Sequence, residues 1–99
     1  MVEVVNIRTC NPPWGQPGDV RIDRLTIWGN PYRMTDDSDY RRDFVCYMYV
    51  SYFMTSELDI AEIANAKRLG CWCKPKRCHG DFLKKMIDEH NAAKQMKLI

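Results

Sequence analysis

Apolar and polar side chains alternate near the start of the chain, where residues 2–7 read Val-Glu-Val-Val-Asn-Ile. This period of two and the β-branched side chains predict a strand, which the Asn-Pro-Pro sequence after Cys10 ends. Prolines and glycines surround Trp14, so an ordered irregular loop is expected next. Residues 19–28 return to a β-like pattern whose apolar parity changes after Ile22. A bulge or two short strands would account for that change.

A helical period replaces the β-like pattern after the break at Gly29-Asn30-Pro31. Ser38 is the expected N-cap of a first helix. The apolar face of that helix comprises Tyr40, Phe44, Tyr47, Met48 and Tyr52. Ser56, followed three residues later by Asp59, predicts the N-cap of a second helix. The apolar residues of the second helix are Leu58, Ile60, Ala61, Ile63 and Ala64.

Residues 68–73 form a short apolar run that is typical of a buried strand and that Lys74-Pro75 stops. The clearest helical period in the chain follows over residues 79–91. Its apolar positions are Phe82, Leu83, Met86, Ile87 and His90. Residues 92–99 are expected to fray. The alternation of strands and helices favours one α/β domain of two or three layers over residues 1–99.

Composition and charge narrow the class of protein. Of the 99 residues, 45% are hydrophobic and 28% are charged, which is typical of a globular domain rather than a disordered or fibrous chain. The net charge of +2 gives no strong basic field, so nucleic-acid binding is not indicated. Without a secretory pattern or an apolar run of membrane-spanning length, we expect a cytoplasmic protein with no membrane partner. Its five cysteines are then expected as thiols, metal ligands or catalytic groups.

Three of the cysteines lie in the stretch GCWCKPKRCHGD at residues 70–81. If the first part of this stretch is a strand, Cys71 and Cys73 point to the same face. Cys78 and His79 return at the start of the last helix, so four soft donors could converge. Zinc accepts such a set of three cysteines and one histidine, although the one-residue gap between the first two cysteines is unusual for it.

A second interpretation of this stretch is an anion site, because a helix N-terminus attracts negative charge. Further positive charge would come from Lys74, Lys76 and Arg77. The same environment would favour the thiolate form of Cys73 or Cys78. His79 could then act as the acid or base partner of the thiol, and Asp81 could orient His79.

Structural roles are the third interpretation of the same residues. Free cysteine behaves as a small hydrophobe, so Cys10, Cys46 and Cys71 suit the core. His79 could equally cap the last helix or form a hydrogen bond in the core. The basic run before it is as consistent with a solvated loop as with a phosphate cradle.

The stretch IWGNPY at residues 27–32 is a second candidate for contact with a ligand. Gly29 permits a close backbone approach, Asn30 offers both donors and acceptors, and Pro31 stiffens the turn. Such a loop after a strand can form the wall of a ligand site or an ordinary turn.

Three segments resemble one family when they are taken in order: VVNIR, IDRLTIWGNPY and RLGCWCKPKRCHGDFL. The matching signature consists of Gly29-Asn30-Pro31, Cys71-Trp72-Cys73, Pro75 and Cys78-His79-Gly80-Asp81. These segments resemble a small phage and bacterial family that is classified only as domain of unknown function 4326. The resemblance implies a phage-type accessory protein with a small Rossmann-like sheet flanked by helices, a type of domain that handles nucleotides or nucleosides.

We therefore expect a ligand site at the carboxyl ends of the strands, where open α/β sheets bind their ligands. The preferred ligand is a small phosphate-bearing molecule of the nucleotide or nucleoside type. The residues expected to bind it are Arg24, Gly29, Asn30, Arg77 and Gly80. The candidates for chemistry are Cys73, Cys78, His79 and Asp81.

Two alternatives belong to other classes of function. In the first, the protein is a small structural zinc domain whose ligands are Cys71, Cys73, Cys78 and His79. In the second, it is a non-enzymatic inhibitor or adaptor that binds a host protein through aromatic anchors. The anchors expected from the sequence are Trp14, Trp28 and Tyr32.

Overall fold

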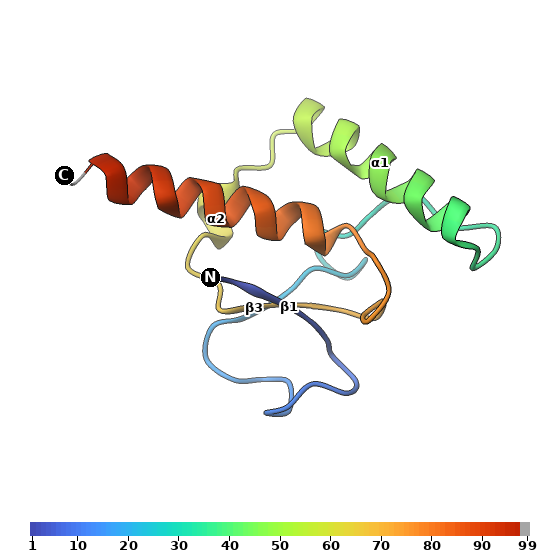
Figure 1. The fold of residues 1–99 in the computed structure, drawn as a ribbon, viewed down its shortest axis with the longest axis horizontal. Coiled ribbons are helices and arrows are strands. Elements are labelled where there is room, and N and C mark those ends of the chain that lie inside the picture. Colours follow the sequence, from blue (N-terminus) through green and yellow to red (C-terminus); the bar gives the residue numbers. More distant parts are fainter. Residues whose placement is uncertain (98–99) are drawn as a thin grey trace.

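The computed structural model describes residues 1–97 and has a mixed α/β fold, with a three-stranded parallel sheet and two α-helices (Figure 1). The elements are β1 (Glu3–Asn6), β2 (Asp19–Arg21), α1 (Asp39–Thr55), the 3-10 helix η1 (Ile60–Ile63), β3 (Arg68–Cys71) and α2 (Gly80–Lys97). β3 lies between β1 and β2 and is parallel to both. The carboxyl ends of the strands therefore lie along the same edge of the sheet.

Different parts of the chain cover the two faces of the sheet. α2 contacts β1 and β3 and buries Leu83 and Ile87 completely. Figure 1 shows both helices on this side and the loop that joins β1 to β2 on the other. The loop places Trp14 so close to Gly70 that a Cβ atom at Gly70 would collide with the indole ring. The central strand therefore needs glycine where the loop packs on it.

A buried ion pair fastens this loop to the sheet. Asp19 and Arg68, at paired positions of β2 and β3, form two hydrogen bonds of 2.7 Å between carboxylate and guanidinium. Arg68 also donates to the carbonyl of Pro12 at 2.8 Å and lies over the ring of Trp14. The pKa of Asp19 is lowered to about 2, mainly by the hydrogen bonds that Arg68 donates to its carboxylate. The irregular loop predicted around Trp14 is confirmed, and side-chain contacts hold it in place.

Helix α1 begins where the sequence predicts, but it buries a different face. Ser38 is the N-cap, and its hydroxyl accepts a hydrogen bond from the amide of Arg41. The predicted apolar face is wrong, because Tyr40 and Tyr47 are 75% and 71% exposed. The buried residues of α1 are Arg42, Val45, Cys46, Tyr49 and Phe53. Aromatic side chains occur on both sides of this helix, so the apolar pattern does not distinguish the two faces.

α1 buries this face because it packs on the N-terminal part of α2 and on the segment around Trp28. The Tyr49 hydroxyl donates to the Trp28 carbonyl at 2.8 Å. The rings of Phe53 and Phe82 meet edge to face with their centroids 5.4 Å apart. Packing of aromatic rings in this arrangement fixes α1 against α2.

The β-like pattern of residues 19–28 gives one short strand and no second one. After β2, two successive turns replace the expected bulge or strand. The Asp23 carboxylate accepts from the amide of Leu25 at 3.1 Å, and the Asp23 carbonyl accepts from the amide of Thr26 at 3.0 Å. Leu25 and Ile27 point into solvent, being 78% and 62% exposed. Local hydrogen bonds of an aspartate therefore override the β propensity of this segment.

The second predicted helix is also wrong. Ser56 is the C-cap of α1 rather than an N-cap, and its hydroxyl donates to the carbonyl of Phe53. Asp59 caps the short η1 instead by accepting from the amide of Ala61. Hydroxyl and carboxylate side chains suit both ends of a turn, so the spacing alone does not specify a long helix.

The two C-terminal elements differ from their predictions in length. β3 ends at Cys71 rather than residue 73, and α2 starts one residue later than expected. Residues 92–97, which were expected to fray, continue α2, and residues 98 and 99 lie outside the described part of the chain. Neither α-helix within residues 1–97 has an apolar stretch long enough to cross a membrane.

Candidate functional site

A pocket of about 360 Å³ lies at the carboxyl ends of β2 and β3, beside the first turn of α2. Four segments line it: residues 23–25, 30–34, 42–46 and 71–79. The pocket therefore joins the strand-loop-helix segment around the cysteines to the turns after β2 and to the N-terminal half of α1. This is the edge at which open parallel sheets bind ligands.

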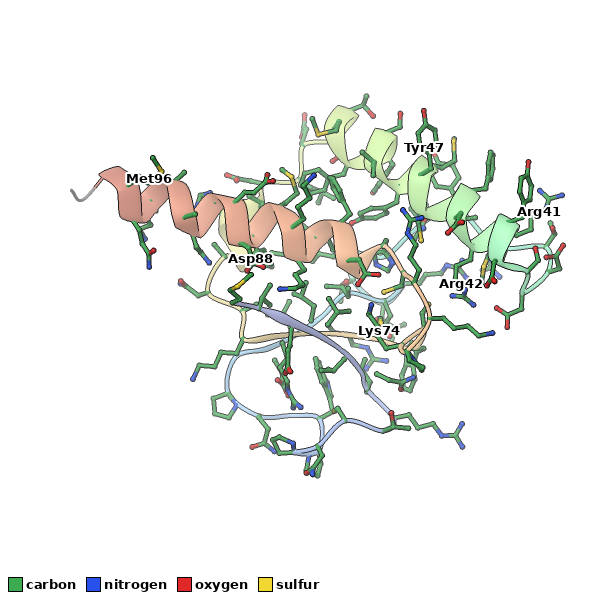
Figure 2. All side chains as sticks on the ribbon, in the orientation of Figure 1. Arg41, Arg42, Tyr47, Lys74, Asp88 and Met96 are labelled. Carbon is green, nitrogen blue, oxygen red and sulfur yellow. The ribbon has the colours of Figure 1, made fainter. Side chains whose placement is uncertain are left out.

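The central charged group of the pocket is Arg42, which is only 6% exposed. One terminal nitrogen of its guanidinium donates to the carbonyl of Arg77 at 3.2 Å, and the other pairs with Asp37. Its Nε is buried without a hydrogen-bond partner among the described residues. Burial opposes the charge of Arg42, but hydrogen bonds with Asp37 and Cys73 raise its pKa. Figure 2 shows Arg42 directed toward the loop between β3 and α2, whereas the neighbouring Arg41 points away.

Two further arginines lie at the rim of the pocket. The Arg24 side chain donates to the carbonyls of Asn30 and Tyr32, at 3.1 and 3.2 Å, and so holds the turn after β2. Arg77 is exposed and pairs with Asp43 of α1 at 2.9 Å. These two guanidiniums and Arg42 come from three different segments that line the pocket.

Three of the cysteines that line the pocket come from residues 71–78, and the sulfur atoms of two of them are in contact. Cys71 and Cys78 have their Sγ atoms 3.4 Å apart. Hydrogen bonds from the thiols of Cys71 and Cys78, together with the guanidinium of Arg42, lower the pKa of Cys73 against the opposing effect of burial. The same hydrogen bonds raise the pKa values of Cys71 and Cys78. Cys73 is also the most exposed of these three cysteines, since Cys71 and Cys78 are buried.

His79 lies next to the cysteines but faces the protein backbone. Its Nε2 is 2.7 Å from the carbonyl oxygen of Ile22, and its ring packs on Tyr49 with the centroids 4.7 Å apart. Burial lowers the pKa of His79. A neutral imidazole that donates Nε2–H to a carbonyl supports the turn after β2 and offers no base at that nitrogen.

Of the four donors proposed for zinc, two sulfurs are in direct contact. They belong to Cys71 and Cys78, whereas the Nε2 of His79 is 2.7 Å from the carbonyl oxygen of Ile22. Among residues 1–97, no group of three or more histidine, cysteine or acidic side chains is arranged to hold a metal ion.

Asp81 does not orient His79. One carboxylate oxygen of Asp81 pairs with Lys74, and the other accepts from the amide of Cys78 at 3.2 Å. Because Asp81 occupies the first turn of α2, these bonds cap the helix and hold the preceding loop. Asp81 is absent from the pocket lining.

The three turn residues proposed as ligand contacts are engaged in the fold. Gly29 lies against the backbone of Asp23, where a Cβ atom would come within 2.5 Å of the carbonyl oxygen. The Asn30 side chain donates to the carbonyl of Val45 at 3.0 Å and accepts from the amide of Tyr32 at 2.9 Å. Gly80 packs on the side chain of Ile22. Of the three turn residues, Asn30 alone contributes to the pocket lining.

The remaining cysteines and aromatic residues have separate positions. Cys10 is half-buried in the loop after β1, and Cys46 is buried in the pocket wall, where burial raises its thiol pKa. Trp28 is 5% exposed, so it is a core residue and not a surface anchor. Trp14 covers the sheet, and Tyr32 lines the pocket.

Comparison with known proteins places the chain in a family. Residues 5–89 match the family described as Domain of unknown function (DUF4326). The chain belongs to DUF4326. It is 33% identical, over 76 residues, to the "Uncharacterized 12.4 kDa protein in nrdA-td intergenic region" of Enterobacteria phage T4. The match covers 71% of this chain and 68% of the phage protein. No solved structure is significantly similar to this DUF4326 chain.

Arg42 and Trp72 are among the pocket residues of this DUF4326 protein that the sequence does not indicate as site residues. Arg42 could have been found from its spacing, because it precedes Cys46 and Tyr49 by four and seven residues and so interrupts a helical face. Trp72 follows directly after β3, which ends at Cys71. Its indole nitrogen donates to Asp23 at 2.9 Å, which brings the loops after β2 and β3 together. No local pattern in the sequence indicates this contact.

Proposed function

We propose that this DUF4326 protein binds a small phosphate-bearing ligand of the nucleotide or nucleoside type in the pocket at the carboxyl ends of β2 and β3. The volume of about 360 Å³ is within the usual range of sites for small molecules. The parallel sheet and the helix that starts beside the pocket support a Rossmann-like analogy, which concerns the fold type alone.

The observation that carries the proposal is the buried guanidinium of Arg42. An arginine Nε–H that is buried without a partner carries a free-energy cost, which a hydrogen bond to an anionic oxygen removes. Arg42 lies in the pocket wall, close to the first turn of α2. Both groups favour negative charge, so a phosphate group is the part of the ligand that they would bind.

The rest of the pocket suits the less polar part of such a ligand. Its other walls include the side chains of Leu25, Tyr32, Met34 and Trp72. Leu25 and Trp72 are 78% and 51% exposed, so both present apolar surface that a flat base or sugar could cover. A phosphate at Arg42 and a base between these residues would fill the pocket from its basic to its apolar side.

The two alternatives lose part of their support. The four donors of the zinc domain are not arranged as a metal-binding group within residues 1–97. The adaptor that binds a host protein loses Trp28, which is buried. A ligand site uses Arg42, Tyr32 and Trp72 as they stand in the pocket, so it is the function that the geometry supports best.

Isothermal titration with nucleotides and nucleosides tests the proposal. The four ribonucleoside monophosphates, their nucleosides and inorganic phosphate are titrated into the wild-type protein. We expect at least one monophosphate to bind more tightly than its nucleoside. Arg42→Met should weaken that binding at least about tenfold, because a hydrogen bond to a charged group contributes about 1.5–3 kcal/mol.

Arg41→Met is the matched control, since Arg41 is the adjacent residue of the same helix and points away from the pocket. This variant should bind within about twofold of wild type, as expected for an exposed position. Arg42→Lys keeps the positive charge and shows whether the protein still folds when the guanidinium is lost. If the nucleosides bind as tightly as their monophosphates, or if a folded Arg42→Met variant binds unchanged, the proposal is wrong.

A further inference from the structure

Trp72 is a large side chain that is 51% exposed and is nevertheless fixed by hydrogen bonds. It follows the last residue of β3 and lines the pocket. Its indole nitrogen donates to a carboxylate oxygen of Asp23 at 2.9 Å. The side-chain amide of Asn6, the last residue of β1, donates to the carbonyl of Trp72 at 3.2 Å. Both the backbone and the ring of this residue are therefore held at the carboxyl ends of the strands.

Arg21, the last residue of β2, completes the support of the ring. Its Nε donates to the same oxygen of Asp23 at 2.7 Å. Its guanidinium lies over the indole of Trp72, with the central carbon 5.7 Å from the ring centroid. Trp72 lines the pocket, whereas Arg21 does not. The indole therefore meets the pocket with surface that Arg21 does not cover.

Asp23 connects this support to a second residue of the pocket. Its other carboxylate oxygen accepts from the amide of Leu25 at 3.1 Å, and Leu25 also lines the pocket. Burial opposes the charge of Asp23, but hydrogen bonds from Trp72 and Arg21 lower its pKa. One ionised carboxylate thus holds two apolar side chains of the pocket in place.

We infer that Trp72 is the residue on which a planar heterocyclic ring of the ligand stacks, and that Asp23 and Arg21 position it. The inference rests on the proposed function and narrows it, because it requires an aromatic base in addition to the phosphate. An aromatic surface that is already in place before binding loses little conformational entropy when the ligand arrives. Every base has a π-face, so stacking on Trp72 recognises the ring without selecting among the four bases.

Two side-chain N–H signals separate the base from the phosphate in a ¹H–¹⁵N NMR experiment. The four ribonucleoside monophosphates, their nucleosides and ribose 5-phosphate are titrated separately into the wild-type protein. We expect the indole signal of Trp72 to move with the monophosphates and the nucleosides. Ribose 5-phosphate should move the Nε–H signal of Arg42 and leave the indole signal in place. Trp72→Phe identifies the indole signal among those of the three tryptophans.

Trp72→Leu removes the flat ring and keeps an apolar side chain. It should weaken the binding of the monophosphates about five- to a hundredfold, as expected for the loss of one base–aromatic stack. It should bind ribose 5-phosphate within about twofold of wild type, because that probe has no base. Tyr47→Leu is the matched control, since Tyr47 is an aromatic residue that is 71% exposed on α1 and does not line the pocket. This control should bind every probe as wild type does.

Asp23→Asn tests the positioning role. The amide group of asparagine replaces one of the two carboxylate oxygens, so Leu25, Arg21 and Trp72 no longer all have an acceptor. The readout is the ratio of the affinities for a monophosphate and for ribose 5-phosphate, which a general loss of stability does not change. We expect this ratio to fall toward the value that Trp72→Leu gives, and an unchanged ratio would show that Asp23 does not position the ring.

The two signals also separate failure of this inference from failure of the proposed function. If the Arg42 signal moves with the monophosphates and the Trp72 signal does not, the stacking role is wrong and phosphate binding stands. Movement of the indole signal alone supports stacking and contradicts the phosphate site. Equal affinities for ribose 5-phosphate and the monophosphates also overturn the stacking role, and two signals that stay in place with every probe overturn both proposals. The wild-type titrations decide these outcomes even if a variant does not fold.

Discussion

Arg42 occupies a position of α1 where helical spacing would place an apolar residue. Its neighbours on that face, Cys46, Tyr49 and Phe53, are all buried. A buried guanidinium needs partners, and Asp37 and the Arg77 carbonyl supply them for the two terminal nitrogens. The Nε of Arg42 has no hydrogen-bond partner among the described residues, and this unsatisfied donor is the reason for proposing a ligand there. A position that violates the packing pattern in this way is a better guide to function than the glycines of the turns.

His79 gives a prediction about stability and pH. Burial lowers the pKa of His79 below its ordinary value of 6.5, so the unfolded chain binds this proton more tightly than the folded chain. The contribution of His79 to the free energy of unfolding is therefore complete above pH 6.5. It is lost as the pH falls toward the pKa that His79 has in the folded protein. His79→Gln should remove this dependence and give a flatter curve.

The measurement for His79 is urea unfolding between about pH 5 and 8, the range in which histidine titrates. His90→Gln is the control, because His90 is the other histidine of the chain and lies further along α2. Parallel curves for wild type and His79→Gln would show that the buried imidazole does not determine the acid sensitivity.

At the level of elements, the sequence is informative where one face of a segment is apolar and the other is polar. The strand near residues 2–7 and the helix after residue 79 have such patterns, and both are found. α1 has aromatic residues on every side, so its position was predictable but its buried face was not. The turns after β2 arise from hydrogen bonds of Asp23 and from contacts with Trp72, which is distant in the sequence. Tertiary contacts of this kind have no local signal.

Helix α2 contributes the main apolar contact with the sheet, which yields a prediction about packing. Leu83 is fully buried, so Leu83→Ala should lower the free energy of unfolding by roughly 2–5 kcal/mol through lost burial and a cavity. Met96 lies on the same helix and is 73% exposed. Met96→Ala should change the free energy by no more than about 0.5 kcal/mol. Urea unfolding measures both, and equal effects would contradict the assigned face of α2.

For the whole molecule, the two coverings of the sheet differ in kind. α2 covers one face by regular apolar packing, whereas the loop around Trp14 covers the other through Arg68 and Asp19. The pocket lies at the edge between the strands and the helices and collects side chains from four segments. The sequence identified the cysteine segment of this pocket, whereas the tertiary contacts of α1 bring Arg42 to it. The candidate site is thus a property of the tertiary fold.

The most direct test of the account is amide ¹H–¹⁵N NMR during titration with an equimolar mixture of the four ribonucleoside monophosphates. We expect concentration-dependent shifts in residues 23–25, 30–34, 42–46 and 71–79, the segments that line the pocket. A parallel titration with the nucleosides should produce smaller shifts around Arg42. If the monophosphates cause no shifts, or shift only residues on the far side of α2 such as Lys84 and Asp88, the pocket is not a nucleotide site and the central claim fails.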